Sequence, residues 1–198
     1  CFDLPGPTHR HVAYDEYKAG RAKTDDNLVL QLERAKDVFT AFGIPIYSHS
    51  GFEADDIIGT IVHDLREDRN VEIIIASGDM DTLQLVQGKR VQVYTPKKGI
   101  NDTILYDEKK VINRFGFSPK LLVDFKGLRG DPSDNIKGVR GIGEKTATDL
   151  IVKFGTIENI YKNLLCQSDV GQKLRPYSRI AQSLESLFEY HAPYYPNS

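Results

Sequence analysis

The run Val71–Ala76 constrains the fold more than any other feature, because it is rich in β-branched residues and leads directly into Gly78-Asp79-Met80-Asp81. A short, nearly all-apolar run is typical of a strand buried on both faces of a parallel sheet. Before it, apolar residues recur at helical spacing over residues 28–42 and 52–67. Alternating helix and strand predict an α/β fold, in which ligands bind beyond the carboxyl ends of the strands.

The character of the chain changes after Pro119, where the expected elements become helical and no strand is predicted beyond about residue 107. The other expected elements before residue 119 are a loop or weak helix over residues 5–27, strands over 44–47 and 91–94, and a helical turn near Leu83. After it we expect helices over 121–128 and 157–164, and a glycine-punctuated turn with a short helix over 138–154. We therefore expect an α/β core over residues 1–118, followed by a helical module over residues 119–198 whose end is an unstructured tail.

Composition excludes some classes of protein. No apolar run approaches the length of about 18 residues that a membrane span needs. The two cysteines, Cys1 and Cys166, cannot form a disulfide framework, which predicts a reducing compartment. The chain has 26 Lys and Arg against 28 Asp and Glu, a formal charge of −2 that by itself disfavours a nucleic-acid partner.

Carboxylates gather in three short motifs. The motifs are Glu53-Ala54-Asp55-Asp56, Gly78-Asp79-Met80-Asp81 and Gly130-Asp131-Pro132-Ser133-Asp134-Asn135. Each has a structural interpretation: the first as the acidic first turn of a helix, the second as a helix cap, and the third as a polar turn. Together they favour a site for hard cations such as Mg²⁺ or Mn²⁺, because oxygen ligands without His or Cys select such ions. Two such ions are the usual apparatus for cleaving phosphodiesters.

Two further motifs are suited to binding phosphate. In the first, Gly141 and Gly143 lie in a turn that leads into a helix, with Arg140 and Lys145 beside it. Glycine permits close backbone approach, and free N–H groups at a helix start bind phosphate, although a plain packing corner is the alternative. In the second, basic residues and tyrosines alternate over residues 9–23, where phosphate and base contacts compete with a merely solvated face.

These motifs together resemble the 5′ nucleases, meaning the 5′–3′ exonuclease domain of bacterial DNA polymerase I and the flap endonucleases. The matching stretches run in order from residue 2 to about 164. They are Phe2-Asp3, Thr8 to His11, Tyr17 to Arg21, Gly43-Ile44-Pro45, Glu53 to Ile58, Gly78 to Leu85, Pro96 to Ile100, Gly130 to Asn135, and Gly141 to Ala147.

The resemblance implies a PIN-like α/β nuclease core with a parallel-rich sheet, followed by a helix-hairpin-helix module. It implies a helical arch over about residues 12–40 and two Mg²⁺ or Mn²⁺ ions. The implied metal ligands are Asp3, Glu53, Asp55, Asp56, Asp79, Asp81, Asp131 and Asp134. Setting these carboxylates aside leaves a basic remainder, so the charge of −2 is compatible with a nucleic-acid partner.

The resemblance also implies roles for basic residues and for the glycine turn. Lys18 and Arg21 match residues near the scissile phosphate and are the candidate catalytic residues. The candidate DNA-binding residues are Arg10, Tyr17, Lys137, Arg140, Gly141, Gly143, Lys145 and Thr146, with a potassium ion at the glycine turn. The implied protein is a monomeric, divalent-metal-dependent 5′–3′ exonuclease or flap endonuclease of bacterial cytoplasm. It acts on DNA with 5′ flaps, nicks or junctions, with a DNA polymerase in the same or another chain, and without a membrane partner.

The resemblance implies a first strand that ends in a metal-binding aspartate before the position of Asp3, and the given sequence does not contain this segment. We also do not recognise the family's final strand in residues 183–198. The alternative hypothesis is therefore a catalytically impaired relative that binds DNA junctions, because it lacks the first metal-ligand strand. A PIN-type ribonuclease is a third hypothesis, which the glycine turn disfavours.

Overall fold

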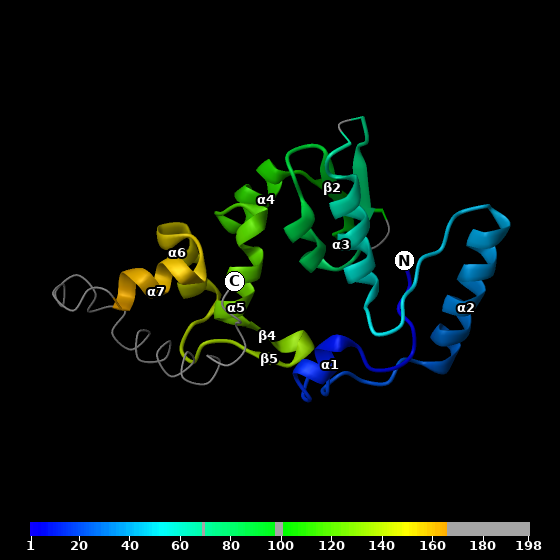
Figure 1. Cartoon of the computed structure of the whole chain (residues 1–198), viewed down its shortest axis with the longest axis horizontal. Coiled ribbons are helices and arrows are strands. Elements are labelled where there is room, and N and C mark those ends of the chain that lie inside the picture. The colour runs from blue at the N-terminus through cyan, green and yellow to red at the C-terminus, as the bar shows by residue number, and fades with distance from the viewer. Residues whose placement is uncertain (69, 98–100, 166–198) are drawn as a thin grey trace. The chain divides into compact units, whose positions relative to one another are not determined.

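The computed structural model describes residues 1–68, 70–97 and 101–165 (Figure 1). Its elements are α1 (His9–Ala13), α2 (Asp26–Ala41), α3 (Ala54–Leu65), β1 (Ile73–Ala76), η1 (Met80–Leu85), β2 (Val91–Pro96), β3 (Thr103–Tyr106), α4 (Glu108–Phe115), η2 (Pro119–Leu121), α5 (Leu122–Arg129), β4 (Gly130–Asp131), η3 (Pro132–Asp134), β5 (Ile136–Lys137), α6 (Glu144–Phe154) and α7 (Ile157–Leu165). The last part of the expected motif Pro96 to Ile100 and the expected tail lie outside the described residues.

The chain forms two compact units that are not two consecutive halves. Unit 1 consists of residues 1–75 together with residues 133–135, and unit 2 consists of residues 76–132 and 136–198. The short segment Ser133–Asn135 therefore belongs to unit 1, although the chain on both sides of it belongs to unit 2.

Unit 1 contains α1, α2 and α3. The helices predicted over residues 28–42 and 52–67 are confirmed as α2 and α3. Helix α2 buries none of its residues, whereas α3 buries Val62. The strand predicted over residues 44–47 is wrong: this segment has no regular secondary structure and forms no ladder. Proline at position 45 has no N–H to donate to a neighbouring strand.

The main sheet has three strands in the order β1-β2-β3. Strands β2 and β3 are antiparallel, with Val93 opposite Tyr106, so the parallel pair of this mixed sheet is β1 with β2. The strand predicted over residues 71–76 is confirmed for Ile73–Ala76, but its burial on both faces is wrong. Ile75 is buried, while Ile74 is 57% exposed, because this short strand is not covered on both faces.

The core of unit 2 joins the sheet to the helices. Its buried side chains include Leu83, Val91, Val93, Tyr106, Val111, Phe125, Leu128, Ala147, Leu150, Ile151 and Ile160. The helices predicted over residues 121–128 and 157–164 are confirmed as α5 and α7, and the expected glycine turn leads into α6. No helix among the described residues is long and apolar enough to cross a membrane.

Strands β4 and β5 form a second, two-stranded sheet, so the expectation of no strand after residue 107 is wrong. The backbone comes very close to itself where β4 begins and β5 ends, and this approach needs glycine at both positions. A Cβ on Gly138 would lie 2.2 Å from the backbone carbon of Arg129, and a Cβ on Gly130 would lie 2.3 Å from the backbone nitrogen of Gly138. The loop that carries Asp131 and Asp134 therefore closes between two glycines. Periodicity does not reveal so short a ladder, because it has only two residues on each side.

Candidate functional site

In unit 1, Arg10 of α1 forms an ion pair with Asp56 in the first turn of α3. Its two terminal nitrogens donate to the two carboxylate oxygens of Asp56, each at 2.7 Å. This fork geometry is the strong form of an ion pair. Asp56 also accepts from the backbone N–H of Glu53 at 2.9 Å, so it caps the helix as well. The hydrogen bonds to Arg10 hold the pKa of Asp56 below its ordinary value, and the same bonds raise the pKa of Arg10.

Tyr17 joins two of the predicted metal ligands. Its side chain is buried, and its hydroxyl lies 3.1 Å from Glu53 Oε2 and 3.2 Å from Asp134 Oδ2. Burial raises the pKa of the Tyr17 phenol far above its ordinary value, and the charges of Glu53 and Asp134 raise it further. The phenol therefore stays protonated and acts as a donor between these carboxylates.

Lys18 and Arg21 pair with the same two carboxylates. The Lys18 Nζ lies 2.8 Å from Glu53 Oε1, and a terminal nitrogen of Arg21 lies 2.6 Å from Asp134 Oδ1. The Lys18 backbone has the left-handed φ of 57°, and its N–H donates to the Asp134 carbonyl at 3.0 Å. A lysine in this conformation is uncommon and is retained where surrounding contacts fix it. The two candidate catalytic cations are thus aimed at carboxylates of their own unit.

The two other predicted ligands of unit 1 are more exposed. Asp3 accepts a hydrogen bond of 2.6 Å from the backbone N–H of Ala54, so it satisfies a free donor at the start of α3. Asp55 lies exposed in the first turn of the same helix, where its charge complements the helix dipole. Glu53 and Asp134, by contrast, have a partner in common, because both contact Tyr17.

In unit 2, Lys126 of α5 joins Asp81 and Asp131. Its ammonium donates to Asp131 Oδ2 at 2.6 Å and to Asp81 Oδ1. Asp81 lies in η1 and Asp131 in β4, and the Asp131 side chain is only 9% exposed. Two carboxylates from separate elements therefore converge on a single cation.

For Asp81, burial and the neighbouring carboxylates act against the contact with Lys126. Burial raises the pKa of Asp81, and the nearby Asp79 and Asp131 carboxylates add to the rise, while Lys126 works against it. Burial alone would lower the pKa of Lys126, but the hydrogen bonds to Asp131 and Asp81 outweigh it and raise that pKa. The ammonium is therefore retained by the carboxylates around it.

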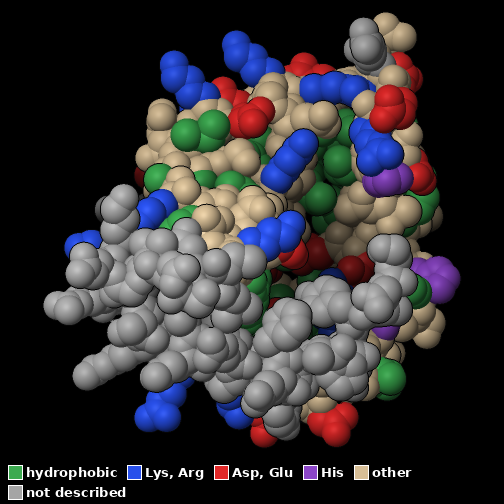
Figure 2. Space-filling view, turned by 60° about the vertical axis from the view of Figure 1, so that its left-hand side comes forward, with side chains coloured by type: hydrophobic (Ala, Val, Ile, Leu, Met, Phe, Trp, Pro, Cys, Tyr) green, Lys and Arg blue, Asp and Glu red, His purple; other side chains and the backbone are tan. Residues whose placement is uncertain are grey.

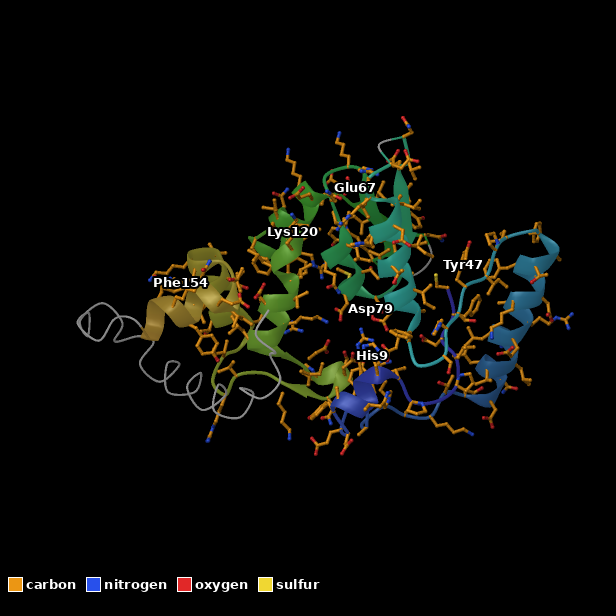
Figure 3. All side chains as sticks on the ribbon, in the orientation of Figure 1. His9, Tyr47, Glu67, Asp79, Lys120 and Phe154 are labelled. Atoms are coloured by element: carbon orange, nitrogen blue, oxygen red, sulfur yellow. The ribbon has the colours of Figure 1, made fainter. Side chains whose placement is uncertain are left out.

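Asp79, which is labelled in Figure 3, follows β1 and caps η1. Its carboxylate accepts from the backbone N–H of Asp81 at 2.8 Å, and its own N–H donates to Ser77 Oγ at 3.0 Å. The cap interpretation and the site interpretation of this motif are both compatible with the geometry. The motif does follow the carboxyl end of a strand, where ligands of α/β sheets bind.

The carboxylates of Asp81 and Asp131 are placed so that both contact one positive charge, the Lys126 ammonium. Oxygen atoms of two carboxylates face one positive charge, and oxygen ligands of this type suit Mg²⁺ or Mn²⁺. Within the described residues, no group of three or more His, Cys, Asp or Glu side chains is arranged as a complete metal site. The predicted ligand set as a whole therefore stays a prediction.

The glycine turn before α6 leaves its backbone open. Gly141 has a φ of +84°, and a Cβ placed on Gly141 or Gly143 would meet nothing within 4 Å. The nearby basic residues Lys137, Arg140 and Lys145 are exposed, and the polar residue Thr146 is half-buried. In the part of the surface that Figure 2 shows, Lys and Arg side chains are spread among acidic ones. The open backbone at the turn distinguishes it from the tightly packed Gly130 and Gly138.

Lys126 is the one residue of these clusters that the motifs did not indicate. Helix α5 carries Asp124 and Arg129 as well as Lys126, so a charge at this position does not stand out in the sequence. The sequence cannot show that Asp81 also reaches it, since that contact joins η1 to α5.

Comparison with known proteins matches the whole described chain to two consecutive families. Residues 1–116 match the 5′–3′ exonuclease N-terminal resolvase-like domain, and residues 117–192 match the 5′–3′ exonuclease C-terminal SAM fold. The chain is 46% identical over 166 residues to DNA polymerase I of Chloroflexus aurantiacus, covering 83% of this chain and 17% of that one. It is 38% identical over 176 residues to DNA polymerase I of Mycobacterium tuberculosis, covering 88% and 19%. The chain thus spans about a fifth of the length of these relatives.

Solved structures share the fold. A bacteriophage T5 protein co-crystallised with metal ions has a TM-score of 0.67 at 25% identity, covering 81% of this chain and 62% of that one. The T5 5′-exonuclease with bound zinc has a TM-score of 0.73 at 24% identity, covering 94% and 68%. The catalytic core of Rad2 with DNA substrate has a TM-score of 0.54 at 16% identity, covering 96% and 58%. The predicted α/β core with a helical module is confirmed.

Proposed function

The chain belongs to the 5′–3′ exonuclease family, and from this membership we propose that it hydrolyses phosphodiester bonds of DNA with a 5′ flap, nick or junction. The observation that carries the proposal is the pair of adjoining family matches, which run in the family's own order from residue 1 to residue 192. Relatives have been solved with DNA and with divalent metal ions, which supports both the substrate class and the cofactor.

Two divalent ions, Mg²⁺ or Mn²⁺, are the proposed cofactor. In unit 2 the proposed ligands are Asp79, Asp81 and Asp131; in unit 1 they are Glu53, Asp55 and Asp134. When bound, such ions supply Lewis-acid polarisation of the phosphate and a more acidic water. Asp3 and Asp56 stay predicted ligands, and the structure gives them partners in Ala54 and Arg10.

Lys18 and Arg21 are the proposed stabilisers of negative charge on the scissile phosphate. Each pairs with a carboxylate of unit 1, Lys18 with Glu53 and Arg21 with Asp134. Preorganised cations of this kind need little rearrangement when charge develops on a phosphate oxygen. The hydrogen bond from the Lys18 N–H to the Asp134 carbonyl supports its left-handed backbone conformation.

The glycine turn of unit 2 is the proposed grip on the duplex backbone. The turn Gly141–Gly143 leads directly into α6, so the first N–H groups of this helix follow an open backbone. Arg140 and Lys145 add positive charge there. Such contacts fix position on DNA without reading its bases, so we expect little sequence preference. A potassium ion at this turn remains part of the proposal, as do a monomeric state, a bacterial cytoplasmic location and a polymerase partner.

A second candidate function is a DNA-junction binder that does not cut. The observation that favours it is the pairing of predicted ligands with the chain's own cations, Glu53 with Lys18 and Asp134 with Arg21. A protein that keeps these pairs in the presence of divalent ions would bind flapped DNA and leave it intact.

The deciding experiment measures cleavage of a labelled 5′-flap duplex by the full chain in Mg²⁺, with and without EDTA. Asp79→Ala removes a proposed ligand, and Asp64→Asn, an exposed acid of α3, is the matched control. We expect cleavage by the wild type and the control, and loss of cleavage in EDTA and in Asp79→Ala. Equal cleavage by Asp79→Ala would refute the site. Tight flap binding with no cleavage, in Mg²⁺ and in Mn²⁺, would establish the second candidate.

A further inference from the structure

We propose that Lys126 is an internal counter-ion that competes with a divalent metal ion for Asp81 and Asp131, and that it thereby sets the metal affinity of unit 2. The proposal rests on the proposed function, because it takes these carboxylates as metal ligands. Lys126 acts here as a positioning residue.

The geometry puts the ammonium where a metal ion would need to be. Its Nζ contacts Asp131 Oδ2 at 2.6 Å and also binds Asp81 Oδ1, so one cation already uses an oxygen of each carboxylate. Magnesium bonds to oxygen at about 2.1 Å. An ion bound to the same two oxygens would touch the ammonium and be repelled by it. The two cations cannot occupy this place together.

The degree of burial makes this competition strong. The Lys126 and Asp81 side chains are 29% and 30% exposed, and Asp131 is 9% exposed. Charges that are partly removed from water interact more strongly than surface charges. A single ammonium brings one positive charge to two carboxylates, whereas a divalent ion brings two. Metal binding is therefore favoured by charge and opposed by loss of the ammonium contacts.

The lysine can leave without unfolding its surroundings. Its four-carbon stem is flexible, and Lys126 lies near the end of α5, whose buried contacts are made by Leu122, Phe125 and Leu128. Withdrawal of the ammonium thus requires a change in side-chain rotamer, and the helix can stay in place. In this account the metal-free protein keeps its acidic pair together through Lys126.

A purely structural role for Lys126 makes the opposite prediction. If the lysine only clips Asp131 to Asp81, removing it separates two ligands, and metal binding weakens. If it competes, removing it frees the ligands, and metal binding becomes tighter. The direction of the change therefore decides between the two roles.

The experiment titrates Mn²⁺ into the full chain without DNA and follows free Mn²⁺ by electron paramagnetic resonance. Lys126→Met removes the charge and keeps the length of the side chain. Lys120→Met, an exposed lysine of the same unit labelled in Figure 3, is the matched control for net charge. Asp81→Asn identifies the binding that belongs to this site.

We expect Lys126→Met to bind Mn²⁺ about tenfold more tightly than the wild type, because the substitution removes the competing ammonium from both carboxylates. Lys120→Met should bind like the wild type. Unchanged or weaker binding by Lys126→Met overturns the proposal. If the wild type binds no Mn²⁺, or if Asp81→Asn binds as the wild type does, the proposed metal site itself fails. If Asp81→Asn loses the ion while Lys126→Met is unchanged, only the role of Lys126 fails.

A second measurement uses the wild type alone, in case Lys126→Met does not fold. Brief acylation with acetic anhydride, read by mass spectrometry, reports how free each lysine amine is. We expect added Mn²⁺ to increase acylation of Lys126 relative to Lys120. The same acylation with and without Mn²⁺, in protein that binds the ion, overturns the proposal.

Discussion

Arg10 and Asp56 are 46 residues apart in the sequence, yet the guanidinium of one holds both carboxylate oxygens of the other at 2.7 Å. The contact fastens α1 to the first turn of α3. Arg10 is a predicted phosphate contact and Asp56 a predicted metal ligand, and here the two side chains bind each other. The pair therefore has a role in stability that can be measured separately from catalysis.

Arg10→Met is expected to lower the free energy of unfolding by about 1–2 kcal/mol at pH 7, since both side chains keep some contact with water. The pKa of Asp56 is lowered in the fold, so its contribution is present above its ordinary pKa near 4 and is lost as pH falls further. Urea denaturation from pH 7 to pH 3 measures this. The difference between the variant and the wild type should shrink at the acidic end. A constant difference would show that Asp56 is not the partner that matters.

Tyr17→Phe removes only the hydroxyl between Glu53 and Asp134. We expect a loss of about 1–2 kcal/mol, because partly buried carboxylates lose a donor. Tyr47→Phe, at an exposed tyrosine labelled in Figure 3, should change little. The raised pKa of the Tyr17 phenol stabilises the fold below about pH 10, and this stabilisation declines as pH rises above that value. Thermal unfolding of the two variants at pH 8 and pH 10.5 tests both expectations, and equal effects of the two substitutions would contradict them.

Gly138→Ala is expected to destabilise unit 2 severely, by more than about 3 kcal/mol, because its Cβ would lie 2.2 Å from the backbone of Arg129. Gly20→Ala is the control, since a Cβ at that position meets nothing within 4 Å. Circular dichroism melts of the two variants provide the comparison. A mild effect at Gly138 would mean that the backbone segments at Gly130 and Gly138 can move apart with little loss of stability.

Lys145→Met is expected to weaken binding of flap DNA in EDTA and to reduce the salt dependence of the dissociation constant by about one unit of slope, as for one lost phosphate contact. Arg140→Met should behave in the same way. Lys162→Met, at an exposed lysine of α7, is the control for net charge. Fluorescence anisotropy between 50 and 200 mM salt, a range over which phosphate contacts have a large effect, measures the slope. An unchanged slope for Lys145→Met would remove it from the DNA contacts.

Local patterns predicted α2, α3, α5 and α7, but they did not predict β3 or α4. The spacing of Ile57, Ile61 and Val62 indicated α3, because one face of that helix is apolar. The strand at residues 44–47 failed because apolar character cannot supply a partner for the ladder. The β4–β5 ladder was missed since it depends on close contact between Gly130 and Gly138 rather than on periodicity.

The residue types of the candidate site could be read from the sequence, but their pairings could not. The role of the acidic motifs as metal ligands stays a prediction. Tyr17 was expected to contact DNA, whereas its hydroxyl contacts Glu53 and Asp134. Lys126 was not indicated at all. Such contacts join residues far apart in the chain, so they depend on tertiary structure, which no local spacing records.

The assignment of Ser133–Asn135 to unit 1 has a consequence for anyone who wishes to divide this protein. No single cut in the polypeptide separates the two units, because the chain leaves unit 1 after residue 75 and returns to it for these residues alone. A gene fragment that ends at residue 75 would encode Glu53 and Lys18 without Asp134. Recombination that exchanged one unit between relatives would therefore need crossovers on both sides of this tripeptide, and simple cassette swaps would yield hybrids with an incomplete acidic set.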